Sequence, residues 1–217
     1  MKPYDLIIFD WDGTLIDSIQ RIVDCFHLSF DELGLTRPDD EAIKQLIGLP
    51  LVDAFKILAG EHGQKVLDDL AAVYRTVWRG NRVPWSQMFG GVPELIDTLA
   101  SDGYQLAIAT GKSRVGLERE LEMHALTDRF PETRCAEETK AKPDPEMLLE
   151  LLTAFDVSAD RALMIGDTDM DLNMARNAKI DAVAVTSGSH PRMQLEASSP
   201  VVVLEKATDL KAWLDSL

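Results

Sequence analysis

The sequence predicts an α/β protein, with a parallel sheet that carries helices and an all-α insert early in the chain. Short apolar runs bounded by polar residues or glycine recur along the chain, as is typical of buried parallel strands. Helical patterns of about ten residues separate most of these runs, which favours right-handed βαβ units. Residues 18–87 interrupt this alternation, because they contain helical patterns and no convincing strand.

Five runs of four apolar residues are the predicted strands of the sheet. They cover residues 6–9, 106–109, 162–165, 182–185 and 201–204. Continuous hydrophobicity indicates strands that are buried on both faces. The helices predicted to cover the sheet span residues 92–99, 114–123, 146–155 and 169–178.

The insert begins with a strongly amphipathic helix. Apolar residues repeat on one helical face at Ile19, Ile22, Val23, Phe26, Phe30 and Leu33. Ser18 is the expected N-cap and Gly34 the expected stop. Further helices are predicted at 41–47, 52–58 and 65–78. We therefore expect two domains, a core formed by residues 1–17 and 88–217 and a helical cap domain formed by residues 18–87.

The composition limits the classes of partner. Lys and Arg total 22 against 37 Asp and Glu, which gives a net charge of −15. Such a surface repels nucleic acid and anionic lipid, so neither is an expected partner. The apolar runs are too short for a signal peptide or a membrane span, and we expect a cytoplasmic protein. The two cysteines, Cys25 and Cys135, show no C-x-x-C spacing, which argues against a disulfide framework or a thiolate metal site.

Polar and charged residues recur where the predicted strands end. Residues 10–14 (Asp-Trp-Asp-Gly-Thr) follow the first strand, and residues 110–112 (Thr-Gly-Lys) follow the second. Lys142 precedes the next strand, and residues 166–171 (Gly-Asp-Thr-Asp-Met-Asp) follow it. Because ligands of open α/β sheets bind at the carboxyl ends of the strands, we expect these segments to converge on one site.

These residue types suit phosphoryl transfer, which needs positioning and charge stabilisation of the phosphate oxygens. Asp10 is the predicted nucleophile, which would form an aspartyl-phosphate. Asp12 is the predicted general acid and base. Mg²⁺ prefers oxygen ligands and would reduce the repulsion between a carboxylate and a phosphate, and Asp10 and Asp167 are its predicted side-chain ligands.

Further residues are predicted to bind the phosphate. Thr110 and Lys142 would supply a hydroxyl group and a positive charge to its non-bridging oxygens. Gly13 would allow a sharp turn that presents backbone amides to the phosphate. Trp11, through its backbone amide rather than its ring, and Gly111 complete the predicted phosphate-binding set.

These motifs resemble the haloacid dehalogenase (HAD) superfamily: D-x-D-G-T, a strand-end Thr, a Lys and G-D-x-x-x-D, in this order along essentially the whole chain. The helical insert resembles the type-1 cap of the phosphoglycolate phosphatase-like subgroup. The resemblance implies a Rossmann-like core, Mg²⁺ and a mobile cap that closes over the substrate. It also implies that Asp12 binds the metal through its backbone carbonyl and that Asp171 supports the site, near the lysine or a metal-bound water.

The resemblance leads us to expect a Mg²⁺-dependent phosphatase for a small phosphomonoester, with phosphoglycolate as the leading substrate. Asp12 argues against a dehalogenase or a phosphonatase, whose sequences lack this aspartate. A β-phosphoglucomutase-like mutase remains an alternative, although such mutases typically show Glu-Asp where this chain has Gly166-Asp167. An inorganic pyrophosphatase is a further alternative.

A phospho-receiver signalling domain is the non-enzyme alternative, since receivers also place carboxylates, a hydroxyl and a lysine around Mg²⁺. In a receiver, however, the acceptor aspartate follows an internal strand, and no helical insert comes after the first strand. We expect a small phosphorylated metabolite as the partner, and a monomer or weak homodimer.

Specificity is expected to come from the cap. The turn at residues 48–50 (Gly-Leu-Pro) resembles a cap loop that dips toward the substrate, and a plain helix–helix turn is the alternative interpretation. Arg21, Lys44, Arg75 and Arg82 are candidates for binding a substrate carboxylate, and the sequence does not choose among them.

Overall fold

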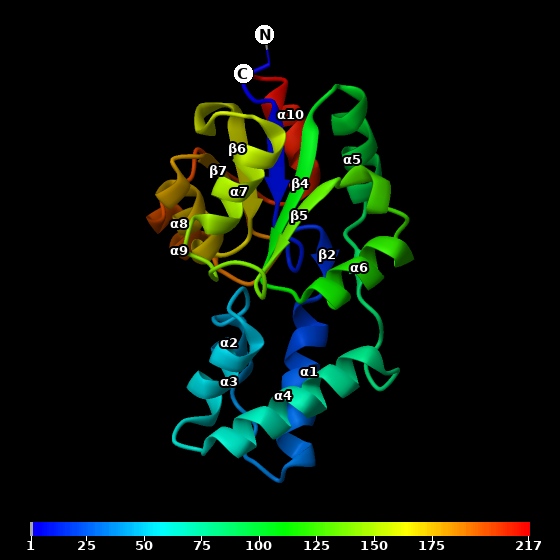
Figure 1. Cartoon of the computed structure of the whole chain (residues 1–217), viewed down its shortest axis with the longest axis vertical. Coiled ribbons are helices and arrows are strands. Elements are labelled where there is room, and N and C mark those ends of the chain that lie inside the picture. Colours follow the sequence, from blue (N-terminus) through cyan, green and yellow to red (C-terminus); the bar gives the residue numbers. More distant parts are fainter. Residues whose placement is uncertain (1) are drawn as a thin grey trace.

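The computed structural model describes residues 2–217 and contains a six-stranded sheet with helices on both faces (Figure 1). The strands are β1 (Leu6–Phe9), β4 (Gln105–Thr110), β5 (Glu132–Cys135), β6 (Ala162–Gly166), β7 (Asp181–Val185) and β8 (Val202–Leu204). Their order is β5-β4-β1-β6-β7-β8, and every pairing is parallel. The predicted α/β fold class is confirmed.

The strand order reverses at β1. The chain adds β4 and β5 on one side of β1, then crosses to the other side and adds β6, β7 and β8. The crevice at the carboxyl ends of β1, β4 and β6 is therefore a topological switch point, which is where open α/β sheets bind ligands.

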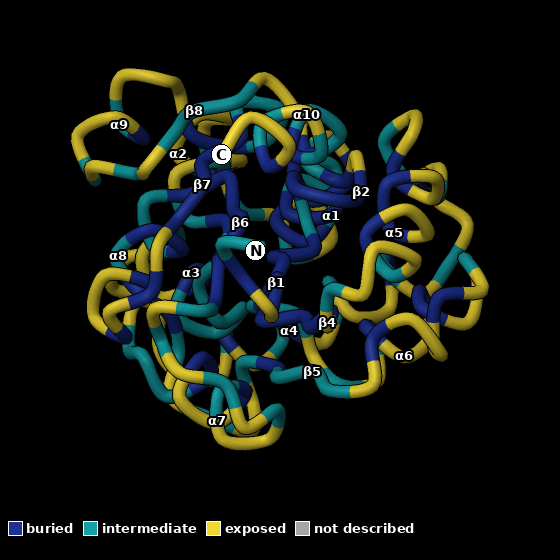
Figure 2. The backbone as a smooth tube through the Cα atoms, turned by 90° about the horizontal axis from the view of Figure 1, so that it is seen from above, coloured by how far each residue is buried: buried dark blue, intermediate teal, exposed yellow. Residues whose placement is uncertain are grey.

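The helices form two layers over the sheet. One face carries α5 (Val92–Ser101), α6 (Arg114–Met123) and α10 (Leu210–Leu214), and the other carries α7 (Glu146–Phe155), α8 (Asp169–Ala178) and α9 (Arg192–Ala197). Ile7 and Phe9 of β1 pack into the first layer, and Leu6 and Ile8 pack into the second. Figure 2 shows β1 and β6 as buried segments near the middle of the molecule. Burial on both faces explains the continuous apolar runs.

The helical insert lies beyond the carboxyl ends of the strands (Figure 1). Its helices are α1 (Ile19–Glu32), α2 (Asp40–Lys44), α3 (Leu51–Ala59) and α4 (Gln64–Arg79). They share an apolar core of their own, in which the rings of Phe26 and Phe55 lie 4.8 Å apart. Ser18 occupies the N-cap position of α1, as predicted, and its hydroxyl makes no capping hydrogen bond within the described residues.

A short antiparallel ribbon connects the insert to the sheet. The chain leaves through β2 (Ile16–Asp17) and returns through β3 (Gln87–Met88), and Asp17 is paired with Gln87. The predicted boundaries at 17/18 and 87/88 fall at this ribbon. The division into a core domain and a separate cap domain stays a prediction.

The structure contains elements that the sequence did not predict. Strand β5 has the polar sequence Glu-Thr-Arg-Cys and lies at the edge of the sheet, where it pairs with β4. The short helices α9 and α10 were missed as well, because six and five residues are too few for a clear helical period. Within residues 2–217, no helix combines the length and the apolar character that crossing a membrane would require.

Phe55 provides a test of the packing inside the insert. Its side chain is fully buried against Phe26, Phe30 and Tyr74. We expect Phe55→Ala to lower the free energy of unfolding by about 3–5 kcal/mol, because it leaves a cavity. Ile57→Ala changes a 60% exposed residue of the same helix, and should shift it by no more than about 0.5 kcal/mol. Urea unfolding of both variants measures the difference, and equal losses would contradict this packing.

Candidate active site

A buried lysine lies between two buried carboxylates at the carboxyl end of β1. Lys142 Nζ donates hydrogen bonds to Asp10 Oδ1 at 2.7 Å and to Asp171 Oδ1 at 2.6 Å. The side chains of Lys142 and Asp171 have no exposed surface, and that of Asp10 is 5% exposed. The structure thus brings together the end of β1, the segment before α7 and the first turn of α8.

Asp167 lies beside Asp10 and Asp171, and the three form an acidic cluster around Lys142 that carries excess negative charge. One carboxylate oxygen each from Asp10, Asp167 and Asp171 lies within 4.8 Å of the others. Thr14 Oγ1 donates to Asp167 Oδ1 at 2.9 Å, and the amide of Ser189 donates to Oδ2 at 2.8 Å. Three carboxylates therefore face a single ammonium group in this cluster.

The burial of these groups shifts their pKa values. Burial raises the pKa of Asp10 well above its usual value, although the charge of Lys142 opposes the shift. Burial and the neighbouring charge of Asp171 raise the pKa of Asp167 to about 7. Burial by itself lowers the pKa of Lys142, but Asp10 and Asp171 outweigh it and leave that pKa raised. Oxygen donors with excess negative charge fit a hard divalent cation such as Mg²⁺, with Asp10 and Asp167 as the predicted ligands.

Two glycines allow the backbone to approach Asp167 closely. A Cβ atom at Gly13, whose φ is +83°, or at Gly188 would collide with the Asp167 carboxylate. The amide of Gly13 itself donates to the carbonyl of Ile16 at 2.9 Å, and the presentation of other amides of this turn to a phosphate stays a prediction. The structure requires glycine at position 13 for the turn and for the close approach.

Asp12 lies in a second charged group beside the acidic cluster. Its Oδ2 atom is 3.1 Å from Lys112 Nζ, which also donates to Glu120 Oε1 at 3.2 Å. The ring nitrogen of Trp11 donates to Glu120 Oε2 at 2.6 Å. Burial lowers the pKa of Lys112, but Asp12 and Glu120 outweigh it and leave that pKa raised. In the described part of the chain, Asp12 Oδ1 is buried and has no hydrogen-bond partner.

No role was predicted for Lys112, Glu120 or the ring of Trp11. One signal was available, because Glu120 is a charged residue on the apolar face of α6, next to Leu117 and Leu121. A charged residue in such a position is almost always paired. Its partners come from other loops, however, and no local spacing predicts them.

The remaining predicted residues lie at the end of β4. Thr110 is 1% exposed and lines a cavity together with Asp10 and Asp12. Gly111 packs under the turn of the insert, since a Cβ atom there would lie 2.7 Å from the carbonyl oxygen of Gly48. The turn at residues 48–50 thus contacts the core beside the site, which favours the interpretation as a site-facing loop over a plain helix–helix turn.

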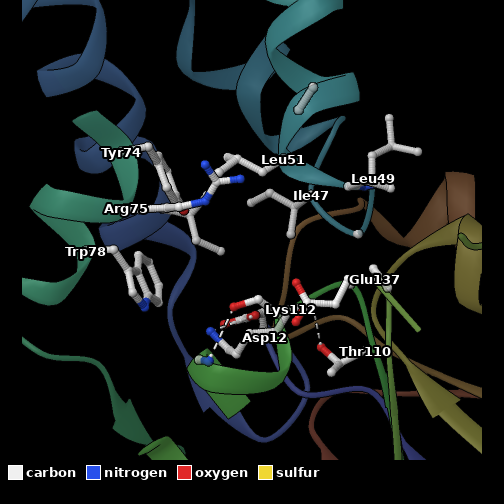
Figure 3. A pocket seen from close by; sticks show the side chains of 18 of the residues that line it. Asp12, Ile47, Leu49, Leu51, Tyr74, Arg75, Trp78, Thr110, Lys112 and Glu137 are labelled. Carbon is white, nitrogen blue, oxygen red and sulfur yellow. Dashed lines mark hydrogen bonds and ion pairs between the residues drawn. The ribbon is translucent and has the colours of Figure 1, made fainter. Parts of the chain in front are cut away.

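The cavity lies between the sheet and the insert and has a volume of about 550 Å³. Figure 3 shows Asp12, Lys112 and Thr110 on one side, and residues of the insert such as Tyr74 and Ile47 across from them. Two further contacts join the insert to the core: Gln194 donates to Gln45 at 3.2 Å, and Lys112 Nζ lies 4.4 Å from the centre of the Trp78 ring.

The four candidate cations for a substrate carboxylate have different surroundings. Arg21 donates to three backbone carbonyls and stacks on two tryptophan rings. Lys44 and Arg82 pair with glutamates on the surface of the insert. Arg75 lines the cavity and has no ion pair or side-chain hydrogen bond within residues 2–217. The structure therefore leaves Arg75 as the available candidate of the four.

The sequence and the structure of this chain are similar to those of known proteins. The family model of haloacid dehalogenase-like hydrolases matches residues 7–185. A Dickeya dadantii protein named probable phosphatase IndB is 36% identical over 97% of this chain and 92% of its own length. A phosphoglycolate phosphatase of Nitrosococcus oceani is 25% identical (99% and 98% covered), and a pyrophosphatase PpaX of Bacillus mycoides is 29% identical (94% and 94%). The solved structure of a haloacid dehalogenase-like family hydrolase from Streptococcus pneumoniae matches with a TM-score of 0.85 at 26% identity, covering 98% of this chain and 99% of that chain.

Gly188→Ala tests whether the enclosed carboxylate of Asp167 belongs to a cation site. In the wild type, Mg²⁺ at 100 times its dissociation constant should add about 2.7 kcal/mol of stability, which raises the melting temperature by about 5–10 °C. The added methyl group should displace Asp167 and remove most of this shift. Gly90→Ala, which meets no atom within 4 Å, is the matched control and should keep the full shift. A full shift in Gly188→Ala would show that Asp167 does not hold the cation.

Proposed function

We propose that this chain, which belongs to the haloacid dehalogenase-like hydrolase family, is a Mg²⁺-dependent phosphatase that hydrolyses a small phosphomonoester through an aspartyl-phosphate. The observation that carries the proposal is the position of Asp10, which Lys142 holds beside two further carboxylates at the edge of a cavity. The relatives named as phosphatases support the reaction class.

Asp10 would act as the nucleophile. Lys142 holds its Oδ1 atom, so the Oδ2 atom is the one that would attack phosphorus. The bond between phosphorus and the ester oxygen would break as the new bond forms, which releases the alcohol and leaves the phosphoryl group on Asp10. The hydroxyl of Thr110 and the ammonium of Lys142 would donate hydrogen bonds to the phosphate oxygens. Mg²⁺, held by Asp10, Asp167 and the Asp12 carbonyl, would offset the repulsion between carboxylate and phosphate.

Asp12 would move the protons. Lys112 holds its Oδ2 atom, and the Oδ1 atom, which has no hydrogen-bond partner among residues 2–217, is available to the substrate. This carboxyl group would give a proton to the leaving alcohol and then take one from the water that hydrolyses the aspartyl-phosphate. Lys112, itself held by Glu120, acts as a positioning residue for Asp12.

Two features bear on the alternatives. Any side chain at Gly166 would collide with Asp171, so the glutamate expected of a mutase does not fit there, which favours hydrolysis over phosphosugar mutation. Membership of a hydrolase family favours an enzyme over a phospho-receiver. Phosphoglycolate and pyrophosphate appear in the names of two relatives and are the first substrates to test.

Asp10→Asn should abolish phosphate release from p-nitrophenyl phosphate, because an amide cannot form the aspartyl-phosphate. The far-UV circular dichroism should stay unchanged. Asp17→Asn, an exposed aspartate in β2, is the control and should retain wild-type turnover. Robust turnover by Asp10→Asn would refute the assignment of Asp10 as the nucleophile.

Excess EDTA should stop phosphate release by the wild-type enzyme, and added MgCl₂ should restore it. Activity in excess EDTA would refute the metal requirement.

Asp12→Ala should lower kcat by about 10²–10⁴-fold, the usual contribution of a general acid or base. Both steps should slow, because the alcohol leaves without a proton and the hydrolytic water is not activated. Rapid-quench measurements with a ³²P-labelled substrate separate phosphoenzyme formation from its hydrolysis. Wild-type rates for both steps would rule out the acid–base role of Asp12.

A further inference from the structure

The cavity has a mainly apolar lining that the proposed phosphoryl transfer does not use. The insert contributes Ile22, Phe26, Ile47, Leu49, Tyr74 and Trp78 to it. The rings of Tyr74 and Trp78 stack 5.9 Å apart at an angle of 11°, and Figure 3 shows them together at one side of the cavity. Val115 of α6 also lines the cavity and is 59% exposed. Ile22, Phe26 and Ile47 belong to the buried core of the insert, whereas Leu49, Tyr74 and Trp78 are only partly buried. The apolar surface that these last three residues and Val115 leave open to the cavity indicates an apolar occupant.

The size of the cavity supports the same conclusion. Its volume of about 550 Å³ falls within the usual range for sites that hold drug-sized organic molecules. Phosphoglycolate and pyrophosphate are small polyanions with almost no apolar surface. Bound at Asp10, either would leave the aromatic and aliphatic lining in contact with water, and the contact area would contribute nothing to binding.

A cationic group is also available in this cavity. Arg75 lines it and is exposed to solvent. Figure 3 shows Arg75 between Tyr74 and Leu51, on the far side of the cavity from Thr110. Of the other cations in the lining, Lys112 is paired with Asp12 and Glu120, and Arg119 stacks on the Trp85 ring. Arg79, one turn after Arg75, has no ion pair within the described residues either, and needs its own variant.

We propose that the substrate is the phosphomonoester of an alcohol with an apolar, ring-sized body and an acidic or other oxygen-acceptor group at its far end. The phosphate would lie at Asp10, the apolar body would lie between Leu49 and the Tyr74–Trp78 wall, and Arg75 would bind the acceptor group, as guanidinium groups bind carboxylates. This inference rests on the proposed phosphatase function and adds the class of its substrate.

The apolar part of the proposal is tested with alkyl phosphates of similar leaving-group acidity. For the wild type with Mg²⁺, kcat/KM for phenylpropyl phosphate should exceed that for propyl phosphate and phosphoglycolate by about tenfold or more, because a buried phenyl group adds apolar contact. Leu49→Ser should reduce the phenylpropyl-to-propyl ratio, and Ile57→Ser, an exposed residue of the insert outside the cavity lining, should not.

The possible outcomes separate this inference from the proposed function. Phosphate release that favours phosphoglycolate or propyl phosphate would overturn the substrate class and leave the phosphatase assignment standing. Release from none of the compounds, including p-nitrophenyl phosphate, would contradict the phosphatase assignment itself.

The role of Arg75 is tested with the para-carboxy derivative of phenylpropyl phosphate. Arg75→Met should lower the carboxy-to-unsubstituted ratio of kcat/KM by about tenfold or more, the usual effect of losing a charge-assisted hydrogen bond. Arg82→Met, which changes an arginine paired with Glu32 on the outside of the insert, is the matched control and should keep the wild-type ratio. An unchanged ratio in Arg75→Met, or a loss seen with Arg79→Met alone, would overturn the assignment of Arg75.

Discussion

The geometry of the site depends on the ion pairs that the ammonium group of Lys142 makes with Asp10 and Asp171. The three residues come from the end of β1, the segment before α7 and the first turn of α8, and their side chains are almost completely buried. Removing Lys142 would leave these buried carboxylates without their counter-charge, which costs roughly 3–5 kcal/mol. Lys142 therefore fixes the position of the Asp10 carboxylate and also holds together parts of the chain that are remote in sequence.

The same arrangement leaves the site with more negative than positive charge. Asp167 adds a third carboxylate, and the backbone around it is so close that Gly13 and Gly188 cannot carry side chains. The neighbouring group of Asp12, Lys112 and Glu120 is more nearly neutral, and Lys112 also contacts Trp78 of the insert. The acidic cluster and the proton-transfer group thus have separate electrostatic surroundings, although Asp10 and Asp12 are only two residues apart.

Much of this arrangement could be predicted, because buried strands and strand-end residues leave local marks in a sequence. The runs at β1, β4 and β6 are apolar throughout, since both faces of these strands are covered, and the residues that follow them carry the chemistry. Strand β5 escaped prediction because an edge strand has one neighbour and tolerates polar residues. The roles of Lys112 and Glu120 could not be predicted from the sequence, because they depend on partners in other segments.

The sequence by itself determined the fold class, the order of the motifs and the kinds of chemical group available, since periodicity and residue type are local properties. Only the tertiary structure decided which of these groups touch. It joined Trp11 to Glu120 and paired the amide of Gly13 with Ile16. Within residues 2–217 it gave Arg75 no ion pair, whereas Arg21, Lys44 and Arg82 have partners. The reason is physical: the pairing of a charge and the shape of a cavity depend on distances between segments that are far apart along the chain.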